Sequence, residues 1–164
     1  MSTRPKETKV REARLPEERA ALEAFVVALN RFEHVFEPNR RLDEAVGPDY
    51  LAVLIKHVKE NEGRIFVAEQ KGVLVGWLVS IIETRDVFVR EDERKLGYVA
   101  ELFVEAAARR GGVGRALIEK AEADFRARGL RKMGITVLPG NAGARAAYAA
   151  WGFEPSAISL CKDI

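Results

Sequence analysis

The sequence has one cysteine, no long hydrophobic run and almost no excess of charge of either sign. Cys161 is the single cysteine among 164 residues, which excludes an internal disulfide and a cysteine-rich metal site. No apolar stretch approaches the ~20 residues that cross a bilayer, and the N-terminus lacks the apolar core of a secretion signal. We therefore predict a cytoplasmic protein with no membrane partner and no metal.

A net charge of +2 is too small to indicate nucleic acid as a partner. The length of 164 residues and the 48% hydrophobic content predict a single domain over residues 1–164 with a sizeable core. Residues 1–7 are predicted to form a flexible N-terminal tail. The sequence leaves the oligomeric state open, and a homodimer is one alternative.

Hydrophobic periodicity predicts an alternation of helices and strands. Strands are expected at Val10–Arg14, Arg64–Gln70, Val73–Ile82, Leu96–Glu105, Arg131–Leu138 and Ala157–Cys161. Helices are expected from Leu15 to Phe32 or Glu33, from after Gly47-Pro48 to near Asn61, from Val113 to Gly129, and at Ala142–Trp151. The order β-α-α-β-β-β-α-β-α-β predicts an α/β fold, with a mixed, mostly antiparallel twisted sheet and helices on both faces. Arg64–Gln70 and Val73–Ile82, joined by a turn at Lys71-Gly72, are expected to form an antiparallel hairpin. The segment from Leu96 to Leu138 is expected to be a parallel strand–helix–strand crossover.

Three glycines occur in four positions directly before the third predicted helix, in Arg109–Gly114. The dinucleotide fingerprint is excluded because no third glycine follows Gly114 at the required spacing, and the P-loop is excluded because GK[ST] is missing. Two alternatives remain. The glycines form a tight turn, or the free N–H groups of Gly111–Gly114 hold a diphosphate, with Arg109, Arg110 and Arg115 as surrounding cations.

Two blocks in this region resemble the GCN5-related N-acetyltransferase (GNAT) family. Arg109-x-x-Gly112-x-Gly114 is similar to its acetyl-CoA signature [R/Q]-x-x-G-x-[G/A]. Asn141, Ala144, Tyr148, Gly152 and Phe153 resemble its N-x-x-A-x-x-x-Y-x-x-x-G-F block, one strand and one helix downstream. The resemblance covers almost the whole chain and implies a GNAT-like fold that transfers an acetyl group from acetyl-CoA to an amine.

The resemblance also implies cofactor contacts along the chain. The diphosphate is expected on Arg109, Arg110, Gly111, Gly112, Val113 and Gly114. The backbone of Phe103 and Val104 is expected to pair with the pantetheine amides, and Asn141 to bond the same arm, although Asn141 also suits a helix cap. Arg115 and Arg145 are within the predicted reach of the adenosine phosphate, although Arg145 is equally suited to a solvated helix surface.

Acetyl transfer needs a group that deprotonates the amine and a group that protonates the departing thiolate. Tyr148 matches the family tyrosine near the cofactor sulfur and is predicted to be the general acid; a packed core tyrosine is the alternative. Glu101 interrupts an apolar strand and is predicted to be the general base. A glutamate on an open sheet face is the alternative there, because the resemblance does not transfer this residue by motif.

The acceptor is predicted to be a small molecule with a primary amine, bound near Glu33, His34 and Glu37 and with Tyr98 as a further contact. Two acids favour a cationic amine, and His34 can share in removing its proton. Each of these residues also suits a plain surface position. A protein N-terminus or lysine is an alternative acceptor, and an acyl-CoA-sensing module without catalysis is the alternative from another class.

Overall fold

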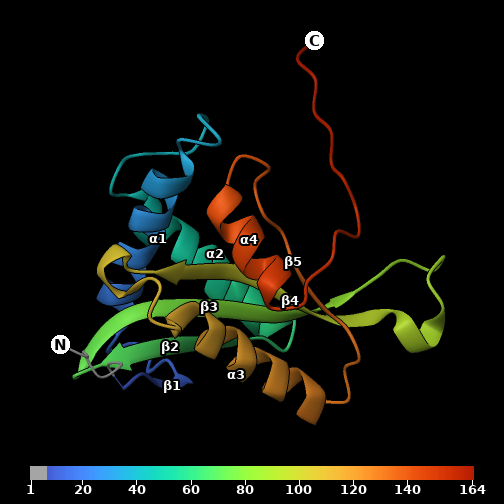
Figure 1. Cartoon of the computed structure of the whole chain (residues 1–164), viewed down its shortest axis with the longest axis horizontal. Helices are drawn as coiled ribbons and strands as arrows, with labels where there is room; N and C mark the ends of the chain where they lie inside the picture. Colours follow the sequence, from blue (N-terminus) through green and yellow to red (C-terminus); the bar gives the residue numbers. More distant parts are fainter. Residues whose placement is uncertain (1–6) are drawn as a thin grey trace.

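The computed structural model describes residues 7–164, and its centre is a five-stranded sheet in the order β1-β2-β3-β4-β5 (Figure 1). The strands are β1 (Lys9–Glu12), β2 (Arg64–Gln70), β3 (Val73–Thr84), β4 (Lys95–Val104) and β5 (Met133–Ile135). The first four strands pair antiparallel, and β4 and β5 pair parallel. The predicted hairpin and the predicted parallel pair are both confirmed.

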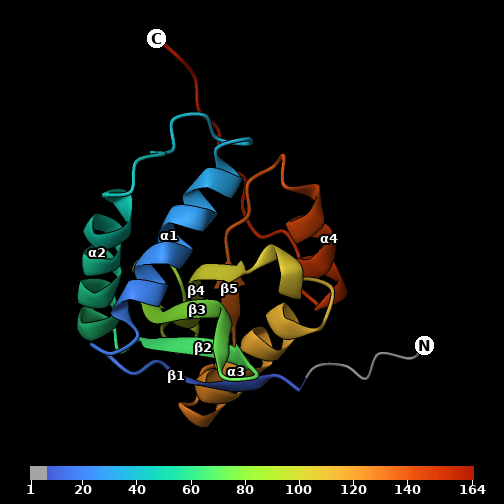
Figure 2. The same ribbon diagram turned by 90° about the vertical axis from the view of Figure 1, so that its left-hand side faces the viewer.

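Helices cover both faces of this sheet, as predicted (Figure 2). The helices are α1 (Arg19–Glu33), α2 (Val46–Glu60), α3 (Val113–Ala127) and α4 (Ala142–Ala150), with short 3-10 turns at Glu91–Glu93 and Ala106–Ala108. The helices α1 and α2 pack with Trp77, Val79 and Phe103 on one face. The helix α3 packs with Phe66 and Leu78 on the other. Within residues 7–164, no helix is long and apolar enough to span a membrane.

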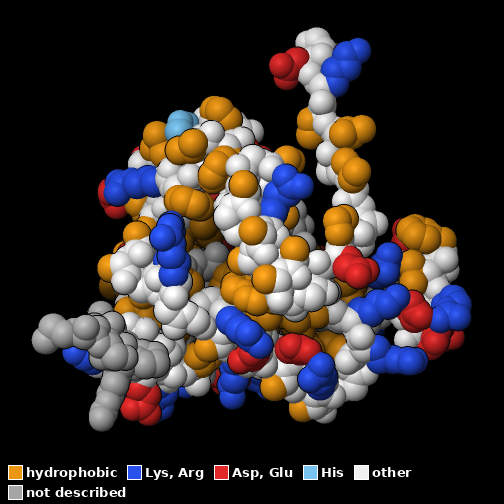
Figure 3. All heavy atoms as spheres, in the orientation of Figure 1, with side chains coloured by type: hydrophobic (Ala, Val, Ile, Leu, Met, Phe, Trp, Pro, Cys, Tyr) orange, Lys and Arg blue, Asp and Glu red, His pale blue; other side chains and the backbone are white. Residues whose placement is uncertain are grey.

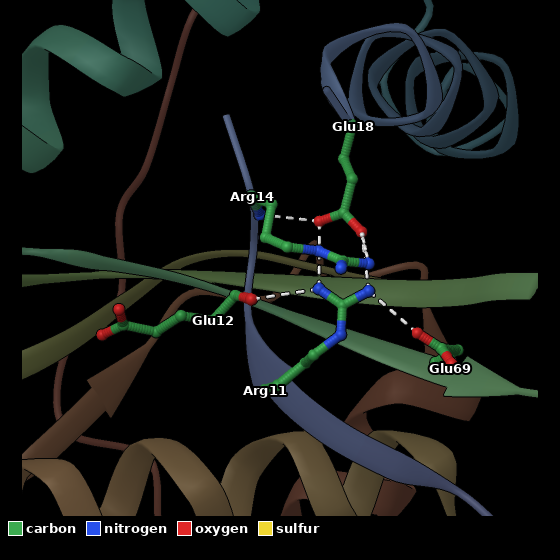
Figure 4. Close-up of polar contacts among 5 residues, drawn as sticks. All are labelled: Arg11, Glu12, Arg14, Glu18 and Glu69. Atoms are coloured by element: carbon green, nitrogen blue, oxygen red, sulfur yellow. Dashed lines mark hydrogen bonds and ion pairs between the residues drawn. The ribbon is translucent and has the colours of Figure 1, made fainter. Parts of the chain in front are cut away.

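A half-buried ion-pair cluster ties β1 to the start of α1 and to β2 (Figure 4). The Arg11 guanidinium donates to Glu18 Oε1 at 2.6 Å and to Glu69 Oε2 at 2.8 Å. The Arg14 backbone N–H also donates to Glu18 Oε2, at 2.7 Å. Hydrogen bonding from Arg11 lowers the pKa of Glu18 to about 2. The cluster therefore fixes where the chain leaves the sheet edge and enters α1.

A β-bulge in β4 sets which side chains face α1 and α2. The register with β3 shifts between Val79 and Ser80, so that Val79 pairs with Glu101 while Ser80 pairs with Val99. Ala100 is therefore the extra residue. A bulge of this kind re-aims the side chains that follow it, and here Val99 faces α3 while Phe103 faces α1.

The parallel pair β4–β5 is short, and this opens the sheet. Pairing runs only from Gly97–Met133 to Val99–Ile135, although β4 continues for five more residues to Val104. The far half of β4 therefore has no neighbouring strand on the β5 side. Glu101 lies at the start of this unpaired half.

The predicted last strand, Ala157–Cys161, is wrong. Residues 153–164 form no helix or strand, and the segment leaves the body of the protein (Figures 1 and 3). Ile158 and Leu160 are more than four-fifths exposed, and Cys161 is exposed rather than buried in a strand. The physical reason is the length of β5, because a strand needs a partner edge and Met133–Ile135 has only three residues. The predicted strand Arg131–Leu138 is correspondingly shortened.

The remaining differences concern element ends and the N-terminus. The helix predicted after Leu15 begins only at Arg19, and α2 begins at Val46, before Gly47-Pro48. Of the predicted flexible tail at 1–7, residues 1–6 lie outside the described part of the chain.

Candidate active site

A cavity of about 210 Å³ lies where β4 and β5 separate. Figure 3 shows a hollow on this face of the molecule, between α1 and α4. Its polar lining residues come from six parts of the chain and are Glu33, Arg40, Tyr50, Glu101, Thr136 and Tyr148. A second groove, of about 280 Å³, lies between α3 and Trp151–Phe153. That groove contains neither Glu101 nor Tyr148, so the first cavity is the candidate site.

The Glu101 carboxylate reaches this cavity because the bulge directs it to the face under α1 and α2. Burial raises the pKa of Glu101 to about 7, against the hydrogen bond that it accepts from Tyr50. The Glu33 charge adds to the rise, and Arg40 opposes it. A carboxyl that titrates near neutral pH can take up and release a proton there, which suits a general base.

Tyr148 lies on α4 and lines the same cavity as Glu101. Its ring packs against Trp151 and Phe153, with centroids 5.8 and 5.9 Å away. Within residues 7–164 its hydroxyl has no hydrogen-bond partner. Burial, with the charges of Glu33 and Glu101, raises the pKa of Tyr148 to about 12. The hydroxyl therefore stays protonated at neutral pH and is free to donate.

Of the predicted acceptor residues, Glu33 alone lines the cavity. Burial raises its pKa, and Arg40 counteracts this through a 2.8 Å ion pair from Nη2 to Glu33 Oε2. Glu37 binds Arg40 Nε at 2.6 Å outside the cavity. The ring of His34 contacts the Arg40 carbonyl oxygen through Nδ1 at 3.1 Å, which makes it part of the loop rather than of the lining.

Tyr98 also lies outside the cavity lining. Its hydroxyl is 2.6 Å from Thr136 Oγ1 and bridges β4 to the chain after β5. Tyr98 pairs with Gly134 in β5, one residue before the parallel pairing of β4 with β5 ends at Val99.

The predicted anion seat is the N-terminal end of α3. Gly112 precedes the helix with a φ of +80°, and no side chain caps the first turn. Within the described chain, the backbone N–H groups of residues 111–115 have no backbone acceptor. A Cβ at Gly112 would meet nothing within 4 Å, so the space beside this glycine is open. This arrangement fits a diphosphate.

Gly114 has a packing role beside that seat. A Cβ there would lie 3.1 Å from Trp151 Cη2, so glycine lets α3 approach the end of α4. The seat and the helix that carries Tyr148 are thereby held close together.

The predicted cations around the seat are partly engaged elsewhere. Arg109 Nε donates to the Val104 carbonyl oxygen at 2.9 Å. Arg115 pairs with Glu119 at 2.8 Å, and Arg145 donates to the Pro139 carbonyl oxygen at 3.2 Å. Arg110 is exposed, with a positive φ of 61°.

The remaining cofactor candidates lie where β4 ends and α4 begins. Phe103 is buried under α1, and Val104 ends β4 on its unpaired side. The Asn141 side chain accepts from the Ala144 N–H at 3.1 Å, so the expected cap of α4 is confirmed. Its role toward pantetheine stays a prediction.

Tyr50 and Arg40 are functional candidates that the sequence did not reveal. Tyr50 lies near the start of α2, and its hydroxyl donates to Glu101 Oε1 at 2.6 Å. Arg40 lies in the connection between α1 and α2 and lines the cavity. No motif marks either residue, because each acquires its role from a neighbour more than five positions away.

Comparison with known proteins agrees with this geometry. Residues 16–153 match the profile of the family described as "Acetyltransferase (GNAT) family". The chain belongs to this family. A search of curated proteins finds no match to the sequence. The predicted identity as an acetyltransferase that uses acetyl-CoA is thus confirmed, and the open seat at Gly112 suits that cosubstrate.

Solved structures of the family share the fold at low sequence identity. A GCN5-related N-acetyltransferase from Ralstonia eutropha is 20% identical, with a TM-score of 0.73 over 96% of this chain and 99% of that one. An acetyltransferase from Clostridium acetobutylicum, solved with acetyl-CoA, is 14% identical, with a TM-score of 0.68 over 96% of each chain. An aminoglycoside acetyltransferase from an uncultured soil metagenomic sample is 21% identical, with a TM-score of 0.63 over 96% of each chain.

Proposed function

We propose that this protein acetylates a primary amine of a small molecule by direct attack on acetyl-CoA in a ternary complex. The observation that carries the proposal is that Glu101 and Tyr148 line one cavity. Glu101, with a pKa of about 7, can accept a proton at neutral pH, and Tyr148, with a pKa of about 12, can donate one. The strand that carries Glu101 ends at Val104, and Arg109, which precedes the open N-terminus of α3, donates to the Val104 carbonyl oxygen. The aminoglycoside acetyltransferase with the same fold supports an acceptor of this size class.

The proton transfers follow from the two side chains. An alkyl ammonium has a pKa of about 10.4 in water and is protonated at neutral pH. Glu101 takes one proton from it, directly or through a water, and the amine nitrogen then attacks the thioester carbon. As the C–S bond breaks, Tyr148 gives its proton to the sulfur. The nitrogen then loses its second proton, which restores the Tyr148 hydroxyl, and Glu101 releases the first proton to solvent. The products are the amide and the free thiol of CoA.

The cavity favours a small cationic acceptor over a polypeptide. Arg40, from the connection between α1 and α2, closes one side of it, and a volume of about 210 Å³ suits a small molecule. Glu33 and Glu101 supply negative charge, while Arg40 is held by Glu33 and Glu37.

Thiol release from acetyl-CoA in the presence of an amine library tests the proposal. We expect at least one small amine to accelerate release, with kcat/KM rising with pH through about 7, the pKa of Glu101. Glu101→Gln should lose most of the turnover and keep CoA binding. Acceleration by peptides alone would favour the protein-acetylating alternative, and CoA binding without any acceleration would favour the sensing alternative.

A further inference from the structure

The Tyr50 hydroxyl reaches Glu101 from α2, whereas Tyr148 lines the same cavity from α4. Tyr50 belongs to α2, whose packing on α1 and on the sheet places its ring partly in the core beside Ala100. Its hydroxyl donates to Glu101 Oε1 at 2.6 Å, a short hydrogen bond of the kind formed with a charged acceptor. No other hydrogen bond to the Glu101 carboxylate exists among the described residues.

We propose that Tyr50 is a positioning residue for Glu101: its hydroxyl holds Oε1 and leaves Oε2 as the atom that receives the proton of the acceptor amine. This inference rests on the proposed function, in which Glu101 is the general base. It assigns different roles to the two cavity tyrosines. The Tyr50 proton is committed to Glu101, while the Tyr148 hydroxyl is unpaired within residues 7–164 and serves as the acid.

The charges around Glu101 explain why it needs such a partner. Glu33 faces it from α1, Arg40 from the connection after α1, Tyr50 from α2 and Tyr148 from α4. Burial and the negative charge of Glu33 disfavour the ionised carboxylate, and Tyr50 and Arg40 favour it. Arg40 is 2.8 Å from Glu33 and is shared with Glu37, so the direct stabilisation of the Glu101 carboxylate comes from Tyr50.

Tyr50 itself remains a donor throughout the working pH range. Burial, the charge of Glu101 and their hydrogen bond together raise the pKa of the Tyr50 hydroxyl well above its usual range. The pair therefore behaves as one titrating carboxyl with a fixed hydrogen-bond donor. Removing the donor should raise the pKa of Glu101 and free its carboxylate to rotate.

The first test is the carboxyl pKa of Glu101, measured by carbon NMR in protein labelled at glutamate, for the wild type and for Tyr50→Phe. Loss of one hydrogen bond to a charged group costs about 1.5 kcal/mol, which corresponds to a rise of roughly one pKa unit. Tyr98→Phe is the matched control, because its hydroxyl bonds Thr136 instead, and it should leave the Glu101 titration in place. An unmoved Glu101 pKa in Tyr50→Phe would overturn the proposal.

The second test is kinetic and uses the amine identified in the library screen. In Tyr50→Phe, kcat/KM should fall about tenfold near neutral pH and recover toward the wild-type value above the raised pKa, with CoA affinity unchanged. In a Glu101→Gln background, the same substitution should change kcat/KM less than twofold, because Tyr50 acts through Glu101. Additive losses, or a pH profile that does not move, would contradict a positioning role.

The two tests separate this inference from the proposed function. If no amine is acetylated but the NMR titration moves as expected, the proposed function fails while the pairing of Tyr50 with Glu101 holds. If amines are acetylated with a rising limb near pH 7 and Tyr50→Phe changes neither measurement, the proposed function stands and the role of Tyr50 is wrong. Thermal denaturation of Tyr50→Phe shows whether the variant keeps its fold.

Discussion

Arg109 is turned back onto the strand that precedes it, where its Nε donates to the Val104 carbonyl oxygen at 2.9 Å. Its guanidinium carbon lies 4.6 Å from the centroid of the Phe32 ring of α1. The charge is therefore directed toward α1 rather than over the glycines, and we expect anion binding at the predicted seat to depend mainly on the backbone N–H groups of α3.

Arg109→Ala should accordingly weaken CoA binding by only a few-fold, because an engaged surface cation contributes about 1 kcal/mol or less. Isothermal titration calorimetry of CoA into the variant provides the measurement. A loss of a hundredfold or more would mean that the guanidinium binds the diphosphate directly, contrary to its contacts here.

Gly112→Leu should abolish measurable CoA binding, because its side chain would occupy the space in front of the free N–H groups. The substitution also places a bulky residue at a φ of +80°, which costs about 1–2 kcal/mol. Gly72→Leu is the matched control, since Gly72 has a φ of +78° in the β2–β3 turn with equally open surroundings. Both variants should lose similar stability, and CoA affinity should drop in Gly112→Leu alone.

Tyr148→Phe should lower kcat by about a hundredfold, the lower range for a lost general acid. Phenylalanine keeps the ring contacts with Trp151 and Phe153, so thermal stability and CoA affinity should change little. Steady-state kinetics and calorimetry measure the two effects. An unaltered kcat would assign the ring a packing role and leave the thiolate to be protonated by water.

The helices, the hairpin and the uncapped helix start at Gly112 were predictable, because periodicity and the two family blocks are local signals. The bulge at Ala100 was not, since it depends on the register with β3, yet it decides which face Glu101 occupies. Tyr50 was missed for a similar reason: its partner is 51 positions away. Ala157–Cys161 had the pattern of a strand, but β5 provides too short an edge to pair with it.

The free energy of unfolding should also depend on pH through the ionisation of Glu101. Its pKa is raised from 4.5 to about 7, so the folded state binds more protons than the unfolded state between these values. Stability therefore falls as pH rises from about 4.5 to 7. Glu101→Gln removes this penalty and should be more stable than the wild type above pH 7, by on the order of 2 kcal/mol. Urea denaturation near pH 5 should show a much smaller difference between the two, and a constant difference would contradict a buried Glu101.

Glu18 should have the opposite pH dependence. Its pKa is lowered from 4.5 to about 2 by Arg11, so its contribution is complete above about pH 4.5 and declines as pH falls toward 2. Glu18→Gln should destabilise the protein at neutral pH by on the order of 2 kcal/mol, with the difference narrowing as the buffer is acidified. Glu12→Gln is the control, because Arg11 contacts only the Glu12 backbone oxygen, while the Glu12 carboxylate pairs with Arg64 at the surface (Figure 4). Urea denaturation of both variants, repeated between neutral pH and about pH 3, measures the loss in the free energy of unfolding for each. Equal losses in the two variants would show that the half-buried cluster holds β1 against α1 no better than an exposed ion pair does.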